Sequence, residues 1–267
     1  MPTPSPARQD PRLCTSRDRQ RHVLRLPPTR RHDPAPRKME RKGERVVAKF
    51  VTIATKPLNR KPNNIYMETF YHGTSVLFKK FDIAHALEGD GKAKFGFGTY
   101  VTESYTSAAH YAYNKKRPEN TDYFVYTLEI PDMTDDNHLF SVRPVHPSII
   151  KRTEKSLGEQ IPNEAKAVGK FFRKYVGNRL TGKDGTIKKL IGSADLDAEK
   201  AASKFFSEIG LEYFAWPQAQ TKPDGLTNRV VLNIDKIRIV RIDKVELDPK
   251  KFHLIEGSEK EIPLDSF

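Results

Sequence analysis

A histidine beside a glycine, in the segment YHGTS at residues 71–75, is the first place where this sequence could do chemistry. Glycine allows a ligand to approach the backbone closely, and the side chains of His72 and Thr74 offer hydrogen bonds to it. Taken alone the pattern says little, because most histidines in a chain of 267 residues bind no ligand. It needs a second constellation before it supports a function.

The second constellation is FGFGTYVT at residues 95–102, followed by SAAHY at residues 107–111. Its glycines do not fit a phosphate-binding Walker loop or a dinucleotide fingerprint, because no GKS or GKT follows them and the turn leads into a strand before any helix. On its own, a tight turn into an edge strand accounts for this segment equally well.

Together, the two constellations resemble the ADP-ribosyltransferase superfamily of the His-Tyr-Glu type, which includes the catalytic domain of poly(ADP-ribose) polymerase and diphtheria toxin. The resemblance covers three places: YHGTS, then FGFGTYVTES with SAAHYA, and then the closing strand TNRVVLNIDKIRI. The loop FDIAHALEGDGKAKFGFGTYVTE, which joins the first two motifs, is more specifically similar to ADP-ribosyltransferase-like domains of bacterial and phage conflict proteins. The first two motifs match in order, and the third matches only in part.

This resemblance implies that the chain uses NAD+ as a substrate and holds no metal ion. His72 would hydrogen-bond to the adenosine ribose with the support of Thr74, and the backbone at Gly73 would hold the nicotinamide carboxamide. Tyr100 would stack on the nicotinamide ring, and Tyr111 would close its other face. Stacking on a cationic, planar group of this kind contributes roughly 0.5 to 2 kcal/mol. The two motifs are therefore expected to converge on one dinucleotide.

The third motif departs from the family, because Asn228 stands where a glutamate usually contacts the nicotinamide ribose. An amide carbonyl can accept a hydrogen bond from the ribose but brings no full negative charge, and losing one preorganised group of this kind costs on the order of 100 to 1000-fold in rate. Asp224 and Glu212 are acids that could supply the charge instead, whereas Glu259 and Glu261 are expected to be solvated surface. The departure favours transfer of a single ADP-ribose over formation of a polymer.

The resemblance thus predicts a glycosyltransferase, an NAD-dependent mono-ADP-ribosyltransferase that releases nicotinamide and acts as a bacterial toxin or an anti-phage defence effector. Such a toxin would need an antitoxin or chaperone as a partner. Fold does not settle the acceptor, but clustered cations favour a nucleic acid, RNA ahead of DNA. The basic residues that carry this inference are Lys115, Lys116, Arg117, Lys151, Arg152, Lys170, Arg173, Lys174, Lys188 and Lys189.

Three other functions stay open. One is a protein-directed mono-ADP-ribosyltransferase, since acids interspersed among these lysines would make them ordinary solvated faces. Another is an RNA 2′-phosphotransferase, which shares the HGT turn but needs further His and Arg positions that the sequence does not show. The last is a non-catalytic RNA-binding protein with a degenerate ADP-ribosyltransferase fold.

The elements that must position these residues follow from hydrophobic periodicity and from Gly and Pro punctuation. Strands are expected at 67–75, 99–102, 123–130, 211–216, 229–234 and 237–247, and 46–53 could be a strand or the start of a helix. Helices are expected at 106–114, 147–157, 162–180 and 196–209, with Pro147 and Pro162 in first turns and Gly210 as a stop. Strands at both ends with helices between them predict an α+β fold. The resemblance further implies an ADP-ribosyltransferase-like split β-sheet core with a helical insertion.

The charge of the chain is concentrated at its N-terminus. Residues 1–49 hold fourteen Lys and Arg against five acids, which is +9 of the formal net charge of +13, together with eight of the nineteen prolines and no Phe, Tyr or Trp. Such a composition cannot bury enough apolar surface to offset chain entropy. We expect a disordered basic tail at 1–45, which could bind RNA or could be an extension upstream of Met39, then the catalytic domain at 46–255 and a polar tail at 256–267.

The rest of the composition limits the class of protein. The single cysteine, Cys14, allows no intramolecular disulfide. The sequence has no apolar run long enough for a membrane span, and its N-terminus lacks the apolar segment of a secretory signal. A cytoplasmic protein with no membrane partner is therefore expected.

Overall fold

The computed structural model of the chain describes residues 66–86, 93–113, 119, 121–183, 185–186, 195–219, 221–222 and 225–266. These residues all belong to one compact unit, Asn59–Phe267. The predicted basic tail and the predicted element at 46–53 lie outside the described residues.

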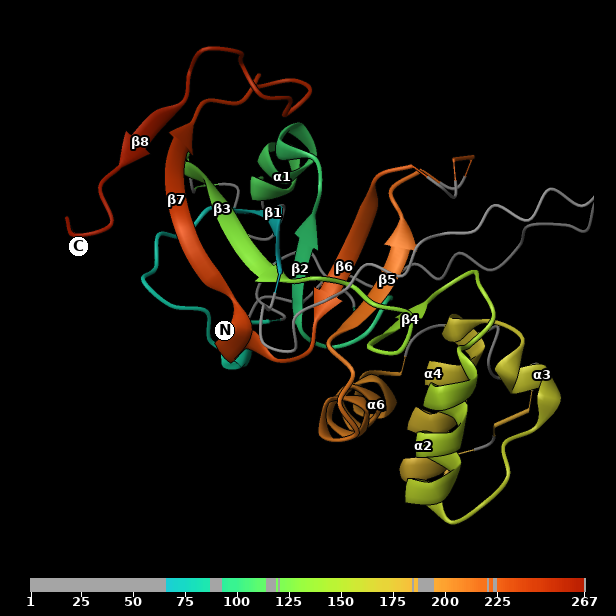
Figure 1. Cartoon of the computed structure of the whole chain (residues 1–267). Coiled ribbons are helices and arrows are strands. Elements are labelled where there is room, and N and C mark those ends of the chain that lie inside the picture. The colour runs from blue at the N-terminus through green and yellow to red at the C-terminus, as the bar shows by residue number, and fades with distance from the viewer. Residues whose placement is uncertain are drawn as a thin grey trace, which may run out of the picture. The chain divides into compact units, whose positions relative to one another are not determined.

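One eight-stranded sheet organises this unit, in the order β4-β5-β6-β2-β1-β3-β7-β8 (Figure 1). Neighbouring strands are antiparallel except for β4 and β5, which are parallel. The strands are β1 (Met67–Thr74), β2 (Thr99–Thr102), β3 (Tyr123–Pro131), β4 (His138–Phe140), β5 (Tyr213–Pro217), β6 (Thr227–Val231), β7 (Arg238–Val245) and β8 (Lys260–Ile262). The mixed sheet and its helices confirm the α+β prediction.

A single helix follows β2, and a group of helices is inserted between β4 and β5 (Figure 1). The helices are α1 (Tyr105–Ala112), α2 (Pro147–Leu157), α3 (Asn163–Lys166), α4 (Gly169–Leu180) and α6 (Leu196–Glu208), with short 3-10 turns at Ile83–His85 and Ile234–Lys236. Local signals explain several boundaries. The side chain of Ser104 caps α1, that of Asp195 caps α6, and Gly210 has a φ of +87° just after α6 ends.

The predicted helix at 162–180 is wrong as a single element. It is broken at Val168, which has an extended backbone, into α3 and α4. The cause lies outside the segment, because Gly169 packs on β4: a Cβ there would lie 2.4 Å from the carbonyl oxygen of Phe140. One helix must therefore end before Val168 and another must begin at Gly169, so that this contact can form.

Two short strands were not expected. β4 is three residues long and pairs with β5, while β8 pairs with β7 through the register Ile242↔Ile262. The second lies inside 256–267, so this segment, predicted as a polar tail, contributes an edge strand to the sheet. Glu261 in β8 keeps a side chain that is 62% exposed, in line with its predicted surface position.

Side-chain alternation divides the sheet into two faces. On the first face, α1 packs against β1 and β3 through Ala108, Ala109 and Val125, and the helices of the insertion cover β4, β5 and β6. On the second face, Phe70, Val101, Tyr126 and other residues form a separate core. The first face therefore carries two helical layers side by side, one over each half of the sheet.

Candidate functional site

The three strands that carry the predicted motifs are neighbours in the sheet. His72 lies on β1, Tyr100 on β2 and Asn228 on β6, and the sheet order is β6-β2-β1. Thr102 of β2 is in register with Asn228 on one side and with Tyr71 on the other. Segments that are remote in the sequence are thus brought together at one place in the fold.

The strands β1 and β2 part from one another near His72. The ladder described between them holds the single pair Tyr71↔Thr102, although β1 continues to Thr74. Beyond that pair, Nδ1 of His72 lies 2.8 Å from the backbone oxygen of Tyr100. A carbonyl oxygen can only accept, so Nδ1 carries the proton and Nε2 of the neutral ring is left as an acceptor. Burial lowers the pKa of His72, which favours this neutral form at pH 7.

The rings of His72 and Tyr100 lie on opposite faces of the sheet. The imidazole packs on the second face, 5.2 Å from the ring of Phe81, whereas the Tyr100 ring packs on the first face, 5.6 Å from Trp216. The two residues meet through the Tyr100 carbonyl and not through their side chains. The two side chains therefore do not converge as the two motifs were expected to, and a ligand that contacts both would have to reach both faces of the sheet.

The Tyr100 ring is fixed by its hydroxyl, which donates to the backbone oxygen of Gly96 at 2.8 Å and accepts from the backbone N–H of Phe95 at 3.3 Å. Burial raises the pKa of Tyr100 to about 12, so the hydroxyl stays protonated. Phe95 stacks on Trp216 with ring centroids 4.2 Å apart and planes 4° apart. Sequence reasoning did not single out Trp216, which completes this aromatic cluster from β5.

Asn228 is the most informative of the predicted residues. Its side chain is 5% exposed, and its Oδ1 is buried without a hydrogen-bond partner in the described part of the chain. A buried acceptor of this kind costs about 1 to 3 kcal/mol when it stays unpaired. Asn228 lies in register between Thr102 and Trp216, on the first face.

Of the two alternative acids, only Glu212 is described, and it lies away from Asn228. Glu212 lies at the far end of the strand pair, since its carbonyl accepts from the N–H of Leu232, and its carboxylate pairs with Lys236. Asp224 lies outside the described residues.

Gly73 and Thr74 end β1, and Tyr111 lies near the end of α1. β1 runs through Gly73, and a Cβ at this position would lie 1.7 Å from the carbonyl oxygen of Ala108, so the approach of α1 requires this glycine. The Thr74 hydroxyl accepts from the N–H of Val76. Tyr111 is 60% exposed on α1, and the described ring contacts do not join it to Tyr100. The predicted sandwich would hold the nicotinamide between the two rings, so it stays a prediction.

A polar bridge that was not predicted crosses the first face. The side-chain amide of Gln218, just after β5, donates to the hydroxyl of Ser107 on α1. Both residues lie in segments that flank Asn228 and Thr102. The signal in the sequence was weak, because Ser107 is part of the second motif but Gln218 lies in no motif at all.

Arg229 holds β6 against the centre of the sheet from the second face. Its guanidinium lies 4.2 Å from the ring centroid of Phe70 and 5.2 Å from that of Tyr213, and it pairs with the carboxylate of Glu68 on β1. The side chain is 2% exposed, so this ion pair is largely desolvated. The strand that carries Asn228 is thus tied to the strand that carries His72.

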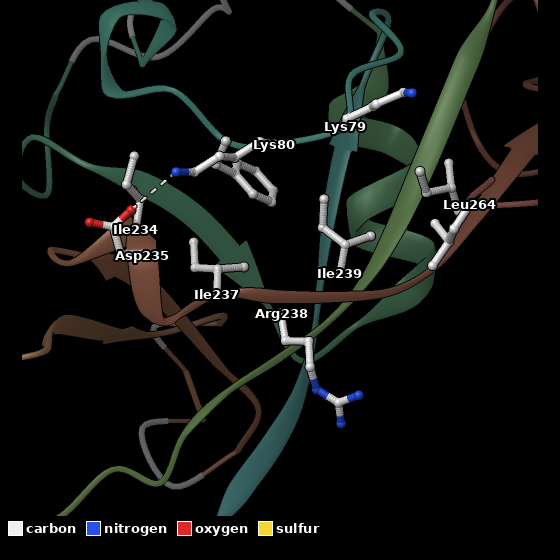
Figure 2. Close-up of a pocket in the computed structure, with 10 residues that line it drawn as sticks. Lys79, Lys80, Ile234, Asp235, Ile237, Arg238, Ile239 and Leu264 are labelled. Carbon is white, nitrogen blue, oxygen red and sulfur yellow. Dashed lines mark ion pairs between the residues drawn. The ribbon is translucent and has the colours of Figure 1, made fainter. Parts of the chain in front are cut away.

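The described part of the chain has two defined hollows, and the first shares Phe81 with the surroundings of His72. One, of about 390 Å³, opens on the second face between Lys80, Ile237 and Leu264, with an ion pair between Lys80 and Asp235 at its rim (Figure 2). The other, of about 500 Å³, lies in the helical insertion between Tyr175 and Arg179. Neither is lined by a predicted site residue. The described side chains include no group of three or more potential metal ligands, and no described helix could cross a membrane.

The structure also reduces the basic surface that favoured RNA. Arg173 and Lys174 are 2% and 8% exposed, so they face the interior of the insertion. Arg152 donates to the backbone oxygens of Ile209 and Asp136. The described cations that remain open to solvent on α2 are Lys151 and Lys155, while 115–117 and 188–189 lie outside the described residues.

No protein-family model matches this sequence, and no curated protein matches it significantly. A function for this chain is therefore inferred from its own residues and their arrangement.

Proposed function

We propose that this chain is a mono-ADP-ribosyltransferase that binds NAD+ where β6, β2 and β1 adjoin, and that it transfers one ADP-ribose to RNA. The observation that carries the proposal is the Oδ1 of Asn228, which is buried and has no hydrogen-bond partner among the residues that the structure describes. It lies on the strand next to Tyr100, and that strand lies next to His72. An acceptor that is buried without a partner among the described residues is available to a ligand that donates to it, such as a ribose hydroxyl.

The proposed reaction breaks one bond to C1′ of the nicotinamide ribose and forms another. The bond between the nicotinamide nitrogen and C1′ of the ribose breaks, its electron pair leaves with nicotinamide, and an acceptor oxygen or nitrogen bonds to C1′ and loses its proton. Oδ1 of Asn228 would accept from a hydroxyl of the nicotinamide ribose as positive charge develops on that sugar. Nε2 of His72 is the acceptor available to the second ribose, since its tautomer is set by the Tyr100 carbonyl.

The absence of a carboxylate at Asn228 fits a slow, single transfer. An amide dipole stabilises an oxocarbenium-like ribose less than a full negative charge does. We therefore expect modest turnover and no elongation of the product.

The test is incubation of the full chain with labelled NAD+ and separate pools of RNA, DNA and protein. Label in the RNA pool, absent for Asn228→Ala and Tyr100→Ala but retained for Arg179→Gln, supports the proposal. Arg179 is the matched control because its exposed side chain lies on α4 and pairs with Glu159, away from the site.

Other outcomes reject parts of the proposal. Label in the protein pool alone would replace RNA with a protein acceptor. Calorimetry that detects no binding of NAD+ to the folded chain would remove the enzymatic function and leave the non-catalytic RNA-binding alternative.

A further inference from the structure

The loop that leads into Tyr100 is held by the helical insertion. The guanidinium of Arg173 on α4 donates from Nη1 to the backbone oxygen of Phe95 at 2.8 Å and from Nη2 to that of Lys94 at 3.1 Å. These two carbonyls belong to the segment 93–98, which precedes β2. A long-range contact between an insertion helix and a loop of the sheet is therefore made through one side chain.

The same guanidinium is fixed from behind by Glu199 on α6. Nε of Arg173 donates to Oε2 of Glu199 at 2.7 Å, and Nη2 donates to Oε1 at 3.3 Å. The side chains are 2% and 3% exposed, so the pair is fully desolvated and its geometry is rigid. A second contact comes from α6, where the hydroxyl of Ser203 accepts from the N–H of Phe97 at 3.0 Å.

The anchored loop in turn sets the aromatic cluster of the site. Phe95 and Gly96 are the backbone partners of the Tyr100 hydroxyl, and the Phe95 ring stacks on Trp216. The residue bound by Arg173 is thus the residue that both orients Tyr100 and covers Trp216. A continuous series of contacts therefore connects α4 and α6 to the Tyr100 ring.

We propose that Arg173 is a positioning residue of the NAD+ site, and that the helical insertion serves to place the Tyr100 side of that site through it. The ligand is the NAD+ of the proposed function, on which this inference rests. A purely structural alternative is that the ion pair with Glu199 only joins α4 to α6. That alternative predicts effects on stability but none on the aromatic cluster.

Substitution of Arg173 by lysine distinguishes the positioning role from the purely structural alternative. Lysine keeps a positive charge beside Glu199, so it avoids leaving a buried carboxylate unpaired. Its single nitrogen cannot reproduce the planar fork that reaches Glu199 and two backbone carbonyls together. Arg173→Lys therefore removes the hold on the loop and spares the ion pair.

The fluorescence of Trp216 reports on the position of the loop at 93–98, because Trp216 is the only tryptophan of the chain. In the full chain without ligand, Arg173→Lys should shift the emission of Trp216 to longer wavelength and increase its quenching by acrylamide, since Phe95 no longer covers it. The dissociation constant for NAD+, measured by calorimetry, should rise by about tenfold or more, as expected when a binding group is displaced. Cooperative thermal unfolding should persist.

Arg179→Lys is the matched control, on the same helix and in an ion pair with Glu159 that touches neither the loop nor Glu199. The proposal is overturned if Arg173→Lys and Arg179→Lys give the same Trp216 emission and the same NAD+ affinity within a factor of two. If wild type binds no NAD+ yet the emission shift appears, the function is wrong and the hold of Arg173 on the loop stands.

A second variant covers loss of folding in Arg173→Lys. Ser203→Ala removes only the hydrogen bond to Phe97. It should move the Trp216 emission and the NAD+ affinity in the same direction by a smaller factor. An unchanged emission in folded Ser203→Ala, together with an unfolded Arg173→Lys, would assign the pair to stability alone and reject the proposal.

Discussion

At the scale of single residues, Asn228 combines near-complete burial with an acceptor that has no partner in the described chain. Removing that acceptor and keeping the volume should relieve its desolvation cost. We expect Asn228→Leu to raise the free energy of unfolding by about 1 kcal/mol, measured by urea denaturation, while NAD+ binding is lost. A gain in stability together with a loss of binding would identify Asn228 as a site residue, because replacing a buried polar residue outside the site would not change the affinity for NAD+.

Thr227→Val is the control for this prediction. The Thr227 hydroxyl, next to Asn228 in β6, is also buried and has no partner within the described segments. Valine should stabilise the protein by a similar amount and leave the affinity for NAD+ unchanged. If Asn228→Leu destabilises the fold, or if it binds NAD+ as wild type does, Asn228 is part of the packing and the third motif lies elsewhere.

Two histidines give the fold a dependence on pH. Burial lowers the pKa of His72 and of His138, against the opposing effect of hydrogen bonds to the backbone oxygens of Tyr100 and Thr134. Both start from an ordinary value of 6.5 in the unfolded chain. As pH falls below that value, the unfolded chain binds protons that the folded chain does not, so the free energy of unfolding decreases until the lowered pKa is passed.

We expect the urea midpoint of wild type to be lower at pH 5.5 than at pH 7.5, and the difference to shrink in the double variant His72→Gln, His138→Gln. His253→Gln, at an exposed histidine, is the control and should keep the wild-type difference. An equal difference in the double variant and in wild type would show that other groups titrate in this range.

At the scale of elements, the closest constraint is between β1 and α1. A Cβ at Gly73 would lie 1.7 Å from the carbonyl oxygen of Ala108, and backbone cannot move aside cheaply. We expect Gly73→Ala to cost at least about 3 kcal/mol of unfolding free energy, because α1 must be displaced from the sheet. Urea denaturation measures this cost.

Gly158→Ala provides the comparison. Gly158 ends α2 with a φ of +70° and has open space around it, so alanine there meets only backbone strain, about 1 kcal/mol. If the two variants cost the same, the close approach of α1 to β1 is not what Gly73 is needed for.

The elements also show what a sequence can predict. β2 and α2 were predicted with the bounds that they have, since a glycine turn, an alternating run and a first-turn proline are local signals. β4 and β8 were missed because each is three residues long and exists through pairing with β5 and β7. The break between α3 and α4 was missed for a similar reason, as it depends on the contact of Gly169 with Phe140.

The candidate site also has one part that the sequence predicts and another part that it does not. The placement of His72, Tyr100 and Asn228 on adjacent strands follows the order of the motifs. The face of the sheet on which each side chain lies could not be predicted in this way. Successive residues of a strand point to opposite faces, and the register between β1 and β2 is set by the pairing of strands in the sheet. Trp216 and Arg173 act through segments that meet only in the folded chain, so no local pattern marks them.

At the scale of the whole molecule, charge and fold are carried by different parts of the sequence. Residues 1–49 hold +9 of the net charge of +13, while the described strands and helices all belong to 59–267. Binding of an RNA by clustered arginine needs no fold, and each phosphate contact on a single strand contributes about 0.7 to the slope of log affinity against log salt concentration. We therefore expect the affinity for RNA to depend on residues 1–49 and the affinity for NAD+ to depend on the folded unit.

Deletion of residues 1–49 tests this separation. We expect the salt dependence of RNA binding to become shallower by several units of slope, because fourteen basic residues are removed against five acids. The urea midpoint of the remaining chain and its dissociation constant for NAD+ should match those of the full chain. An unchanged slope would place the RNA contacts on the folded unit, with the lysines of α2 as the first to substitute. A loss of NAD+ affinity would instead make the basic segment part of the binding site, since the strands that carry His72, Tyr100 and Asn228 would then be insufficient without it.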